Sequence, residues 1–298
     1  MTAVIVGASG QLGRALRRRF PEAVALDRAV LDVSDAVAVR DHDWAGVDVV
    51  LNAAAYTAVD AAEEPANLDA VRRVNVDAVA HLAEAAQRHG FTLVHVSSEY
   101  VFDGRHRGPI PEDLPPSPLS VYGRSKADGD RAAEGADRHY VLRTTWLVGE
   151  GGNFVRTMAS LAQRGVRPSV VDDQIGRPTF TTDLADAVAH LLATGAPFGT
   201  YNVTCAGEPA SWAGVAAAVF EACGRAPGDV TPVSTADYVA DRPQAAARPR
   251  NSVLDLSKIT ATGFRPREWR SALIDYLDGL APDAAGQPPG SARRSGGR

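Results

Sequence analysis

Tyr122 and Lys126 are the pair of residues whose types and spacing most directly suggest chemistry in this sequence. On a helix, residues four apart lie on one face and one turn from each other. A tyrosine hydroxyl has an ordinary pKa of about 10, which makes it a weak acid at neutral pH. A neighbouring ammonium stabilises the phenolate and lowers that pKa, so the pair predicts a general acid adjusted by a lysine. A surface helix with a half-buried tyrosine and a solvated lysine fits the same spacing.

A glycine-rich turn near the N-terminus predicts a site for a dinucleotide. The apolar run 3–6 leads into Gly7, Gly10 and Gly13, and the segment 14–20 that follows has helical character. Gly7 permits a tight turn, Gly10 lets the backbone approach a pyrophosphate, and Gly13 lets the helix pack on the strand. The first N–H groups of the helix would then face the phosphates. A plain loop is the alternative interpretation, because the spacing departs from the commoner Gly-x-Gly-x-x-Gly.

The end of the next expected strand bears on the choice of cofactor. Segment 24–26 ends at Asp27 and Arg28. A carboxylate at Asp27 suits a ribose 2′-hydroxyl and favours NAD, whereas a guanidinium at Arg28 suits a 2′-phosphate and favours NADP. Because both residues are present, NADPH and NADH both remain open. Asp32 and Val33 follow and are expected beside the adenine.

The alternation of strands and helices in the first half predicts an α/β fold, a doubly wound parallel sheet of Rossmann type. Ligands bind at the carboxyl ends of the strands in such sheets. The segments 7–13, 52–57 and 97–104 each follow a strand, so they should converge on one crevice. The expected strands are 3–6, 24–26, 47–51, 92–96 and 140–146, and a long helix is expected over 63–89.

Six motifs occur in a fixed order along residues 1 to about 275. They are GQLG at 10–13, NAAAYTAVD at 52–60, SEYVFDG at 98–104, RTTW at 143–146, DQIGRPT at 173–179 and RPRNS at 248–252. Together with Tyr122 and Lys126, these motifs resemble those of the dTDP-4-dehydrorhamnose reductase family, a group of extended short-chain dehydrogenase/reductases.

The resemblance implies reduction of the C4 ketone of a dTDP-4-keto-6-deoxy sugar, with NADPH or NADH supplying the hydride. Tyr122 would protonate the ketone oxygen, Ser98 would hydrogen-bond the same oxygen, and Lys126 would hold the nicotinamide ribose. The expected conversion is dTDP-4-dehydro-L-rhamnose to dTDP-L-rhamnose. Reduction of another dTDP-4-keto sugar for a natural-product glycoside is the nearest alternative. A non-catalytic NAD(P)-binding regulatory subunit is an alternative of another class.

The turn, the strand ends and the resemblance together give two sets of expected binding residues. The cofactor set is Gly7, Gly10, Gln11, Leu12, Gly13, Asp27, Arg28, Asp32, Val33, Ala53, Ala54, Ala55, Thr57, Tyr122 and Lys126. The substrate set is Glu99, Tyr100, Trp146, Asp173, Gln174, Arg248, Asn251 and Ser252.

The sequence departs from the family pattern at several positions. Ser98 and Glu99 stand where Thr-Asp is frequent; Ser98 keeps the hydroxyl, while the longer Glu99 could reshape the sugar pocket. Ala61 stands where a lysine is common. Ala15 stands where some members have a glutamate that helps bind a metal between subunits, which puts a metal-bridged dimer in doubt. We expect no metal, and a monomer or a homodimer.

Composition excludes several other classes of function. The formal net charge is −5 and the body of the chain has no Lys/Arg run, so nucleic acid is not an expected partner. No apolar stretch is long enough to span a bilayer, and the N-terminus has no basic region typical of a signal peptide. Cys205 and Cys223 cannot form a disulfide framework and are expected to be reduced. We therefore expect a cytoplasmic protein with no membrane partner.

The chain is long enough for two modest domains. We expect a dinucleotide-binding domain over 1–147, with part of 181–195 returning to it. A smaller C-terminal substrate domain should occupy most of 148–281. The segment 282–298 consists mainly of Pro, Gly, Ala, Ser and Arg, so it is expected to be a disordered tail.

Overall fold

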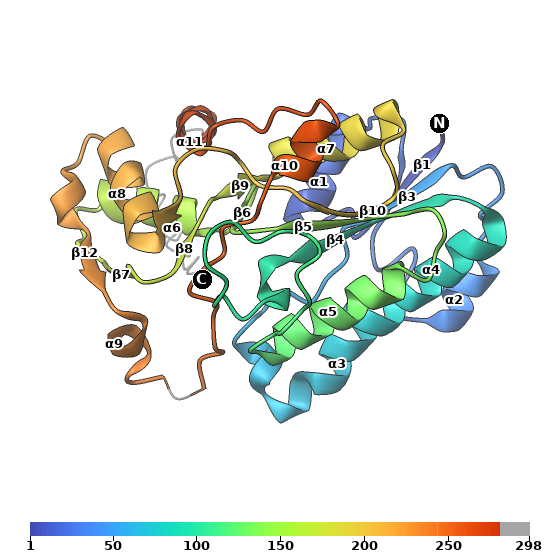
Figure 1. Cartoon of the computed structure of the whole chain (residues 1–298), viewed down its shortest axis with the longest axis horizontal. Coiled ribbons are helices and arrows are strands. Elements are labelled where there is room, and N and C mark those ends of the chain that lie inside the picture. The colour runs from blue at the N-terminus through green and yellow to red at the C-terminus, as the bar shows by residue number, and fades with distance from the viewer. Residues whose placement is uncertain (243, 281–298) are drawn as a thin grey trace, which may run out of the picture.

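A parallel six-stranded sheet forms the centre of the computed structural model, which describes residues 1–242 and 244–280 (Figure 1). Its strands are β1 (Ala3–Val6), β2 (Val24–Leu26), β3 (Val49–Asn52), β4 (Thr92–Ser98), β5 (His139–Thr144) and β10 (Gly199–Asn202). They are ordered β10-β5-β4-β3-β1-β2, and every neighbouring pair is parallel. The strand order reverses between β1 and β3, as in a Rossmann-type sheet, which confirms the predicted α/β class.

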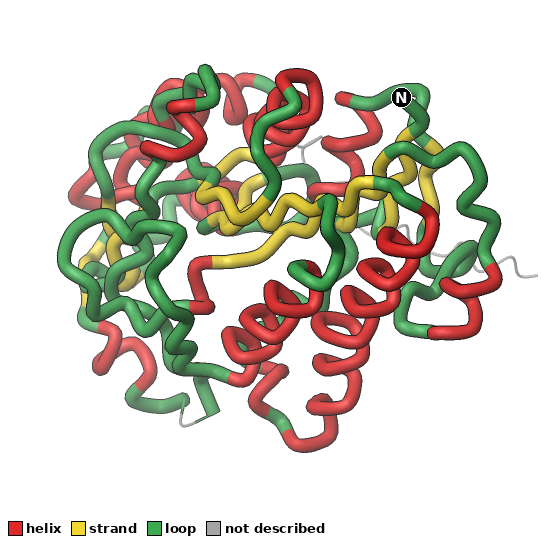
Figure 2. The backbone as a smooth tube through the Cα atoms, turned by 45° about the vertical axis from the view of Figure 1, so that its right-hand side comes forward, coloured by secondary structure: helices red, strands yellow, loops and turns green. Residues whose placement is uncertain are grey.

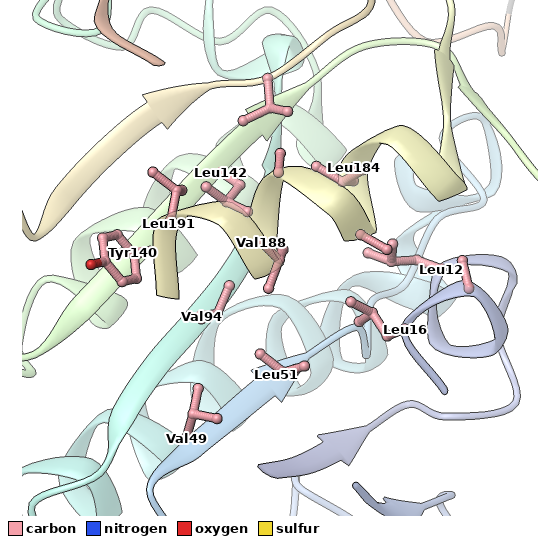
Figure 3. Close-up of a cluster of buried hydrophobic side chains, with 14 of the residues drawn as sticks. Leu12, Leu16, Val49, Leu51, Val94, Tyr140, Leu142, Leu184, Val188 and Leu191 are labelled. Carbon is pink, nitrogen blue, oxygen red and sulfur yellow. The ribbon is translucent and has the colours of Figure 1, made fainter. Parts of the chain in front are cut away.

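Helices cover both faces of this sheet. Its strands are apolar on both faces because successive side chains alternate between two cores. Helices α1 (Gln11–Arg19) and α7 (Thr181–Thr194) cover one face, where Figure 3 shows leucines of both helices directed toward strand side chains such as Leu51 and Val94. The other face packs against α2 (Ala36–Asp41) and α4 (Ala78–His89), with α5 (Val121–Ala133) beside α4 (Figure 2).

A second, smaller group of elements lies beyond the C-terminal ends of the central strands (Figure 1). Its helices are α6 (Phe154–Gln163), α8 (Trp212–Ala222), α9 (Thr235–Val239) and α11 (Trp269–Asp278). Its strand pairs are β6 (Leu147–Val148) with β9 (Thr179–Phe180), β7 (Ser169–Val171) with β12 (Thr231–Val233), and β8 (Ile175–Gly176) with β11 (Ala210–Ser211). Residues such as Val155, Phe220 and Trp269 form a separate core there.

The second half of the chain also contributes to the first core. Helix α7 packs on α1, which places the expected returning segment 181–195 against the central sheet. Strand β10 pairs with β5 and adds a sixth strand that the sequence did not assign to this sheet. The short helix α10 (Ser257–Ala261) contributes Ile259 to the same core. Which residues belong to the substrate domain remains a prediction.

The long helix expected over 63–89 is interrupted, and the reason is a buried polar side chain. Asn75 exchanges hydrogen bonds with the backbone of Tyr56 at 2.8 and 3.1 Å and donates to Ser125 Oγ at 2.9 Å. Gly129 of α5 lies so close that an added Cβ would sit 2.3 Å from the Asn75 carbonyl oxygen. The segment consists of 3-10 turns at Ala61–Glu63 and Pro65–Asn67, α3 (Leu68–Arg72), a π turn at Arg73–Asp77, and α4. Such π turns frequently mark functional sites.

The described residues bear on the expectations about membrane spans, metal sites and disulfides. No helix among them is long and apolar enough to cross a membrane. Within the same residues, no three His, Cys, Asp or Glu side chains gather as a metal site would require. Cys205 is buried and Cys223 is partly buried, and both are free thiols. The expected tail, 282–298, lies outside the described residues.

Candidate active site

The glycine turn is built from close backbone contacts. Gly7 has φ +71°, and a Cβ there would lie 2.5 Å from the amide nitrogen of Ala54. A Cβ on Gly13 would lie 2.3 Å from the Gly7 carbonyl oxygen. Within the described part of the chain, a Cβ on Gly10 would have one neighbour within 4 Å, that same oxygen at 3.4 Å. Gly10 caps α1 without a side chain, and the first turn of α1 contains no acidic residue. The first N–H groups of α1 are therefore free of a side-chain cap, which suits a phosphate.

Strand register brings three strand ends to the same edge. Val6 of β1 lies opposite Asn52 of β3, and Asn52 lies opposite His95 of β4. Farther along, Ser98 is paired with Thr144 of β5. The segments after β1, β3 and β4 consequently meet, as the sequence predicted, around a cavity of about 480 Å³.

Many of the predicted residues line this cavity. They are Gly10, Gln11, Leu12, Ala53, Ala54, Ala55, Thr57, Ser98, Glu99, Tyr100, Tyr122, Lys126 and Trp146. Residues outside the two expected binding sets also line it, and several of them lie in the predicted segments or motifs; they are Asn52, Val59, Val96, Ser97, Thr144, Thr145, Leu147 and Trp212. Buried atoms of the lining residues, among them Gln11 Oε1 and Thr144 Oγ1, have no hydrogen-bond partner among the described residues. They add polar groups that a bound ligand could satisfy.

The residues expected around the adenosine lie outside the cavity lining. Asp27 Oδ1 accepts hydrogen bonds from the backbone of Ala29 at 3.0 Å and Val30 at 3.2 Å, so it stabilises its own turn. Arg28 forms an ion pair with Asp32 at 3.2 Å, and its side chain is 82% exposed. Val33 is buried in the core between the sheet and α4. Their roles toward a cofactor remain predictions.

Three of the residues expected to bind substrate lie in the smaller region, outside the cavity lining. Asp173 accepts a hydrogen bond from the backbone N–H of Thr235 at 2.9 Å. Gln174 is buried and donates to Thr235 Oγ1 at 3.0 Å. Ser252 is buried, and its backbone N–H donates to the Ile175 carbonyl at 2.7 Å. These contacts fix the loops of the smaller region.

Two further expected substrate residues, Asn251 and Arg248, have protein partners. Asn251 Nδ2 donates to the carbonyl oxygens of His106 at 2.9 Å and Gly108 at 2.8 Å. Arg248 Nη2 contacts both carboxylate oxygens of Asp60, at 2.8 and 2.9 Å. Arg248 also interacts with the cavity residue Tyr100. Burial raises the pKa of Tyr100, and the positive charge of Arg248 offsets part of that increase. Arg248 thus lies next to the cavity lining, and its contact with substrate remains a prediction.

Helix α5 presents Tyr122 and Lys126 to the cavity, one turn apart as predicted. The helix is capped by Ser120, whose Oγ accepts from the Gly123 N–H at 3.0 Å. Lys126 Nζ donates to the Val96 carbonyl at 2.8 Å and lies 3.4 Å from the His95 ring. Burial lowers the pKa of Lys126 to about 8. The ammonium is therefore close to releasing its proton near neutral pH.

The predicted effect of the lysine on Tyr122 is wrong for this structure. We expected the Lys126 ammonium to lower the tyrosine pKa. Instead, burial raises the pKa of Tyr122 well above its usual value, the negative charge of Glu99 raises it further, and a hydrogen bond with Ser98 opposes both. The physical reason is desolvation of both residues, since burial disfavours the phenolate and also the ammonium that would stabilise it. Tyr122 is thus held as a protonated phenol.

Glu99 is an unusual carboxylate for its position. It is buried, with 2% of its surface exposed, and its Oε2 accepts a hydrogen bond from Ser98 Oγ at 2.6 Å. Burial raises the pKa of Glu99 to about 7, against the lowering effect of the Ser98 hydrogen bond. Near neutral pH this carboxyl is therefore present in both protonation states.

Two stacked indoles line the cavity on the side of the smaller region. Trp146 follows β5 and has φ 44°, a left-handed backbone conformation that bulky residues rarely adopt. Its ring stacks on Trp212 with centroids 3.9 Å apart and an interplanar angle of 22°. Trp212 begins α8, whose apolar composition gave no sign of a second indole at the site. Its proximity to Trp146 depends on packing between distant segments.

Comparison with known proteins identifies relatives along nearly the whole chain. The model of one family, described as the RmlD substrate binding domain, matches residues 1–281. The dTDP-4-dehydrorhamnose reductase of Streptomyces griseus is 42% identical over 304 residues, which cover 96% of each chain. The dTDP-4-keto-6-deoxy-D-glucose reductase of Streptomyces niveus is 38% identical, covering 94% of this chain and 98% of the relative. A crystal structure of dTDP-4-dehydrorhamnose reductase from Bacillus anthracis in complex with NADP superposes with a TM-score of 0.85 at 32% identity, covering 93% of this chain and 99% of that one.

Proposed function

The chain belongs to the RmlD substrate binding domain family, which includes dTDP-4-dehydrorhamnose reductases, and from this membership we propose that it is an NAD(P)H-dependent reductase of dTDP-4-keto-6-deoxy sugars. The observation that carries the proposal is the cavity itself. One end is an uncapped helix N-terminus behind a glycine turn, and the other presents Ser98, Tyr122 and Lys126.

The residues present fit a nicotinamide dinucleotide. The α1 N-terminus and Gly10 offer backbone N–H groups for the pyrophosphate, and the small residues 53–55 leave room for a flat cofactor against the strand end. When bound, the reduced nicotinamide supplies the hydride that is added to C4. We propose that Lys126 and Tyr122 hold its ribose, because both line the cavity.

The side chains of this chain would supply the proton and the orientation. Tyr122 donates its phenolic proton to the ketone oxygen as negative charge develops there, and its raised pKa keeps the phenol protonated until that moment. An alkoxide is far more basic than a phenolate, so the transfer remains favourable. Ser98, paired with Thr144 at the end of β4, would orient the same oxygen. The stacked Trp146 and Trp212 would pack beside the sugar nucleotide and exclude water.

We propose dTDP-4-dehydro-L-rhamnose as the substrate and dTDP-L-rhamnose as the product. The Streptomyces griseus relative supports this choice. The second candidate is another dTDP-4-keto-6-deoxy sugar, which the Streptomyces niveus relative and the departure at Glu99 both favour. The two candidates share the chemistry at C4 and differ in the sugar that the pocket accepts.

We also propose a cytoplasmic location and a monomer or homodimer as the active species. The supply of NAD(P)H and of nucleotide sugars supports the location. Light scattering of the purified protein measures the second property directly.

The test is an assay with purified protein and two substrates, dTDP-4-dehydro-L-rhamnose and dTDP-4-keto-6-deoxy-D-glucose, each with NADPH and with NADH. Nicotinamide absorbance gives the rate, and NMR identifies the product. Preferential formation of dTDP-L-rhamnose supports the first candidate, and preference for the other ketosugar supports the second. Tight binding of NADPH without turnover of either sugar, or of a wider panel of dTDP-4-keto sugars, would indicate a binding protein instead.

A further inference from the structure

We infer that Glu99 is a positioning residue for the reduction: as a neutral carboxylic acid it donates a hydrogen bond to Ser98 Oγ, which leaves the single proton of Ser98 available to the substrate ketone. The inference rests on the proposed function, because it concerns the same ketone oxygen. It assigns to Glu99 a role through Ser98, in place of the expected direct contact with the sugar.

The geometry that carries this inference is a short contact in a dry environment. Ser98 Oγ and Glu99 Oε2 are 2.6 Å apart, and both side chains are buried. Ser98 Oγ also accepts from the backbone N–H of Tyr100 at 3.3 Å. Among the described residues, Glu99 forms no ion pair that would compensate a buried negative charge.

A count of protons distinguishes the two states of Glu99. A serine hydroxyl has one proton to donate. If Glu99 is ionised, Ser98 donates its proton in a hydrogen bond to the carboxylate, and the ketone oxygen receives a hydrogen bond from Tyr122 alone. If Glu99 is neutral, its O–H donates a hydrogen bond to Ser98 Oγ, and Ser98 can donate its own proton in a hydrogen bond to the ketone oxygen. The second state places two donors where negative charge develops, which is the arrangement that stabilises an oxyanion.

The charged and titratable groups around Glu99 are consistent with a reaction rate that depends on the protonation of Glu99. Tyr122 and Lys126 face the same cavity from α5, and Tyr100 adjoins Glu99 on its own turn, with Arg248 and Asp60 beyond it. His95 lies on β4 beneath Lys126, and burial keeps its pKa well below the ordinary value. Burial raises the pKa of Glu99 to about 7. Because an ionised Glu99 also raises the pKa of Tyr122, protonation of Glu99 favours the reaction in two ways.

The chemical balance of the reaction is unchanged by this role. Hydride from the reduced nicotinamide forms the C4–H bond, the ketone π bond breaks, and its oxygen takes the proton of Tyr122. Glu99 keeps its proton throughout. Its influence is therefore on the rate at a given pH and not on the stoichiometry.

The experiment compares pH profiles of kcat for the wild type, Glu99→Gln and Ser98→Ala, with saturating dTDP-4-dehydro-L-rhamnose and NADPH. The glutamine amide donates to Ser98 Oγ at every pH, so it imitates the neutral acid. We expect wild-type kcat to fall about tenfold or more with a midpoint near pH 7, since one donor to the oxyanion is lost. Deprotonation of Lys126 adds a separate fall near pH 8 in every variant. Glu99→Gln should keep the fall near pH 8 and the wild-type kcat at pH 6, but it should abolish the fall near pH 7. Ser98→Ala should also abolish it, at a low rate throughout.

Glu112→Gln is the matched control. Burial also raises the pKa of Glu112, but this residue accepts from the Asn202 N–H at 2.9 Å and lies outside the cavity lining. Its variant should keep the wild-type profile. A Glu99→Gln enzyme that retains the fall in kcat near pH 7, or that loses kcat equally at all pH values, would overturn the inference. A variant that changes only KM would also overturn it, because it would indicate direct substrate binding.

A second measurement separates this inference from the proposed function. Infrared difference spectra between wild type and Glu99→Gln should show a protonated carboxyl band at pH 6 that disappears with a midpoint near pH 7, and Ser98→Ala should shift that band. This readout needs no turnover. A missing band at pH 6 would overturn the inference even in an active enzyme, whereas a normal band without turnover of any ketosugar would overturn the proposed function alone.

Discussion

The two ends of the cavity are built by different means. At the glycine turn, the site is formed by backbone atoms that leave no room for side chains. A Cβ on Gly13, for example, would lie 2.3 Å from the Gly7 carbonyl oxygen. At the other end, the site is formed by buried side chains, and burial shifts the pKa values of Glu99, Tyr122 and Lys126. Substitutions at the first end should act through folding and cofactor binding. Those at the second should act through proton chemistry.

The largest effect is expected from Gly13→Ala. Its Cβ would meet the backbone of Gly7 and Ala8 at 2.3–2.7 Å, and backbone atoms cannot move aside cheaply. We expect a loss of several kcal/mol of folding stability or a failure to fold, well beyond the roughly 1–3 kcal/mol typical of overpacking. Thermal or urea unfolding measures it.

Gly10→Ala is the matched control for that substitution. Its Cβ would meet only the Gly7 carbonyl oxygen, at an ordinary 3.4 Å. We expect wild-type stability with weakened NADPH binding, because the methyl group stands where the pyrophosphate would approach. Equal stability losses in both variants would contradict the role given to the backbone contacts.

Lys126→Met should have opposite effects on activity and stability. Loss of the ammonium should lower kcat about 10²-fold or more, the range typical of acid–base groups. Burial lowers the pKa of Lys126 to about 8, so the unfolded chain binds more protons between pH 8 and the ordinary lysine value of about 10.5. The contribution of Lys126 to stability therefore rises with pH across that window. The variant should be more stable than wild type at pH 7, by about 1–3 kcal/mol.

Lys258→Met provides the comparison for Lys126. Lys258 Nζ donates to the Thr200 carbonyl at 2.7 Å, and the residue lies outside the cavity lining. Its substitution should leave kcat unchanged. A Lys126→Met variant that keeps wild-type kcat and loses stability would contradict the expectation that substitutions at this end of the cavity act through proton chemistry.

A smaller effect is expected from Arg28→Ala, at the adenosine side of the glycine turn. The Arg28 side chain is 82% exposed, whereas Asp27 is engaged by its own turn. If Arg28 contacts a 2′-phosphate, its loss should raise KM for NADPH about tenfold, the value of one charge-assisted hydrogen bond, without changing KM for NADH. Steady-state kinetics with both cofactors measure the ratio. Equal changes in KM for NADPH and NADH would show that Arg28 does not bind the 2′-phosphate.

The parts of the site that the sequence predicted depend on local pattern and on chain order. The glycine turn, the small residues 53–55 and the pair Tyr122 and Lys126 all follow from spacing after a strand or within a helix. The parallel sheet then brings them to one edge. Such features require no knowledge of which distant segments pack together.

The parts that it did not predict depend on long-range packing. The π turn around Asn75 exists because this side chain reaches the backbone of Tyr56 and the hydroxyl of Ser125. Trp212 lies at the cavity through packing against Trp146 and Phe154, which come from other segments of the chain. The predicted direction of the Tyr122 pKa shift was wrong. The sequence spacing indicated the charge of Lys126 but not that both residues are buried.

The most direct test of the central claim is a single-turnover measurement of hydride transfer in Tyr122→Phe. Phenylalanine keeps the ring and its edge contact with Tyr100 but loses the hydroxyl proposed to contact the ribose, so NADPH affinity should fall by about tenfold at most, and the measurement is made with saturating NADPH. We expect the rate of nicotinamide oxidation by dTDP-4-dehydro-L-rhamnose to fall roughly 10²–10⁴-fold, because the acid is lost. A variant that binds NADPH normally and reduces the ketone as fast as wild type would contradict the assignment of Tyr122 as the proton donor.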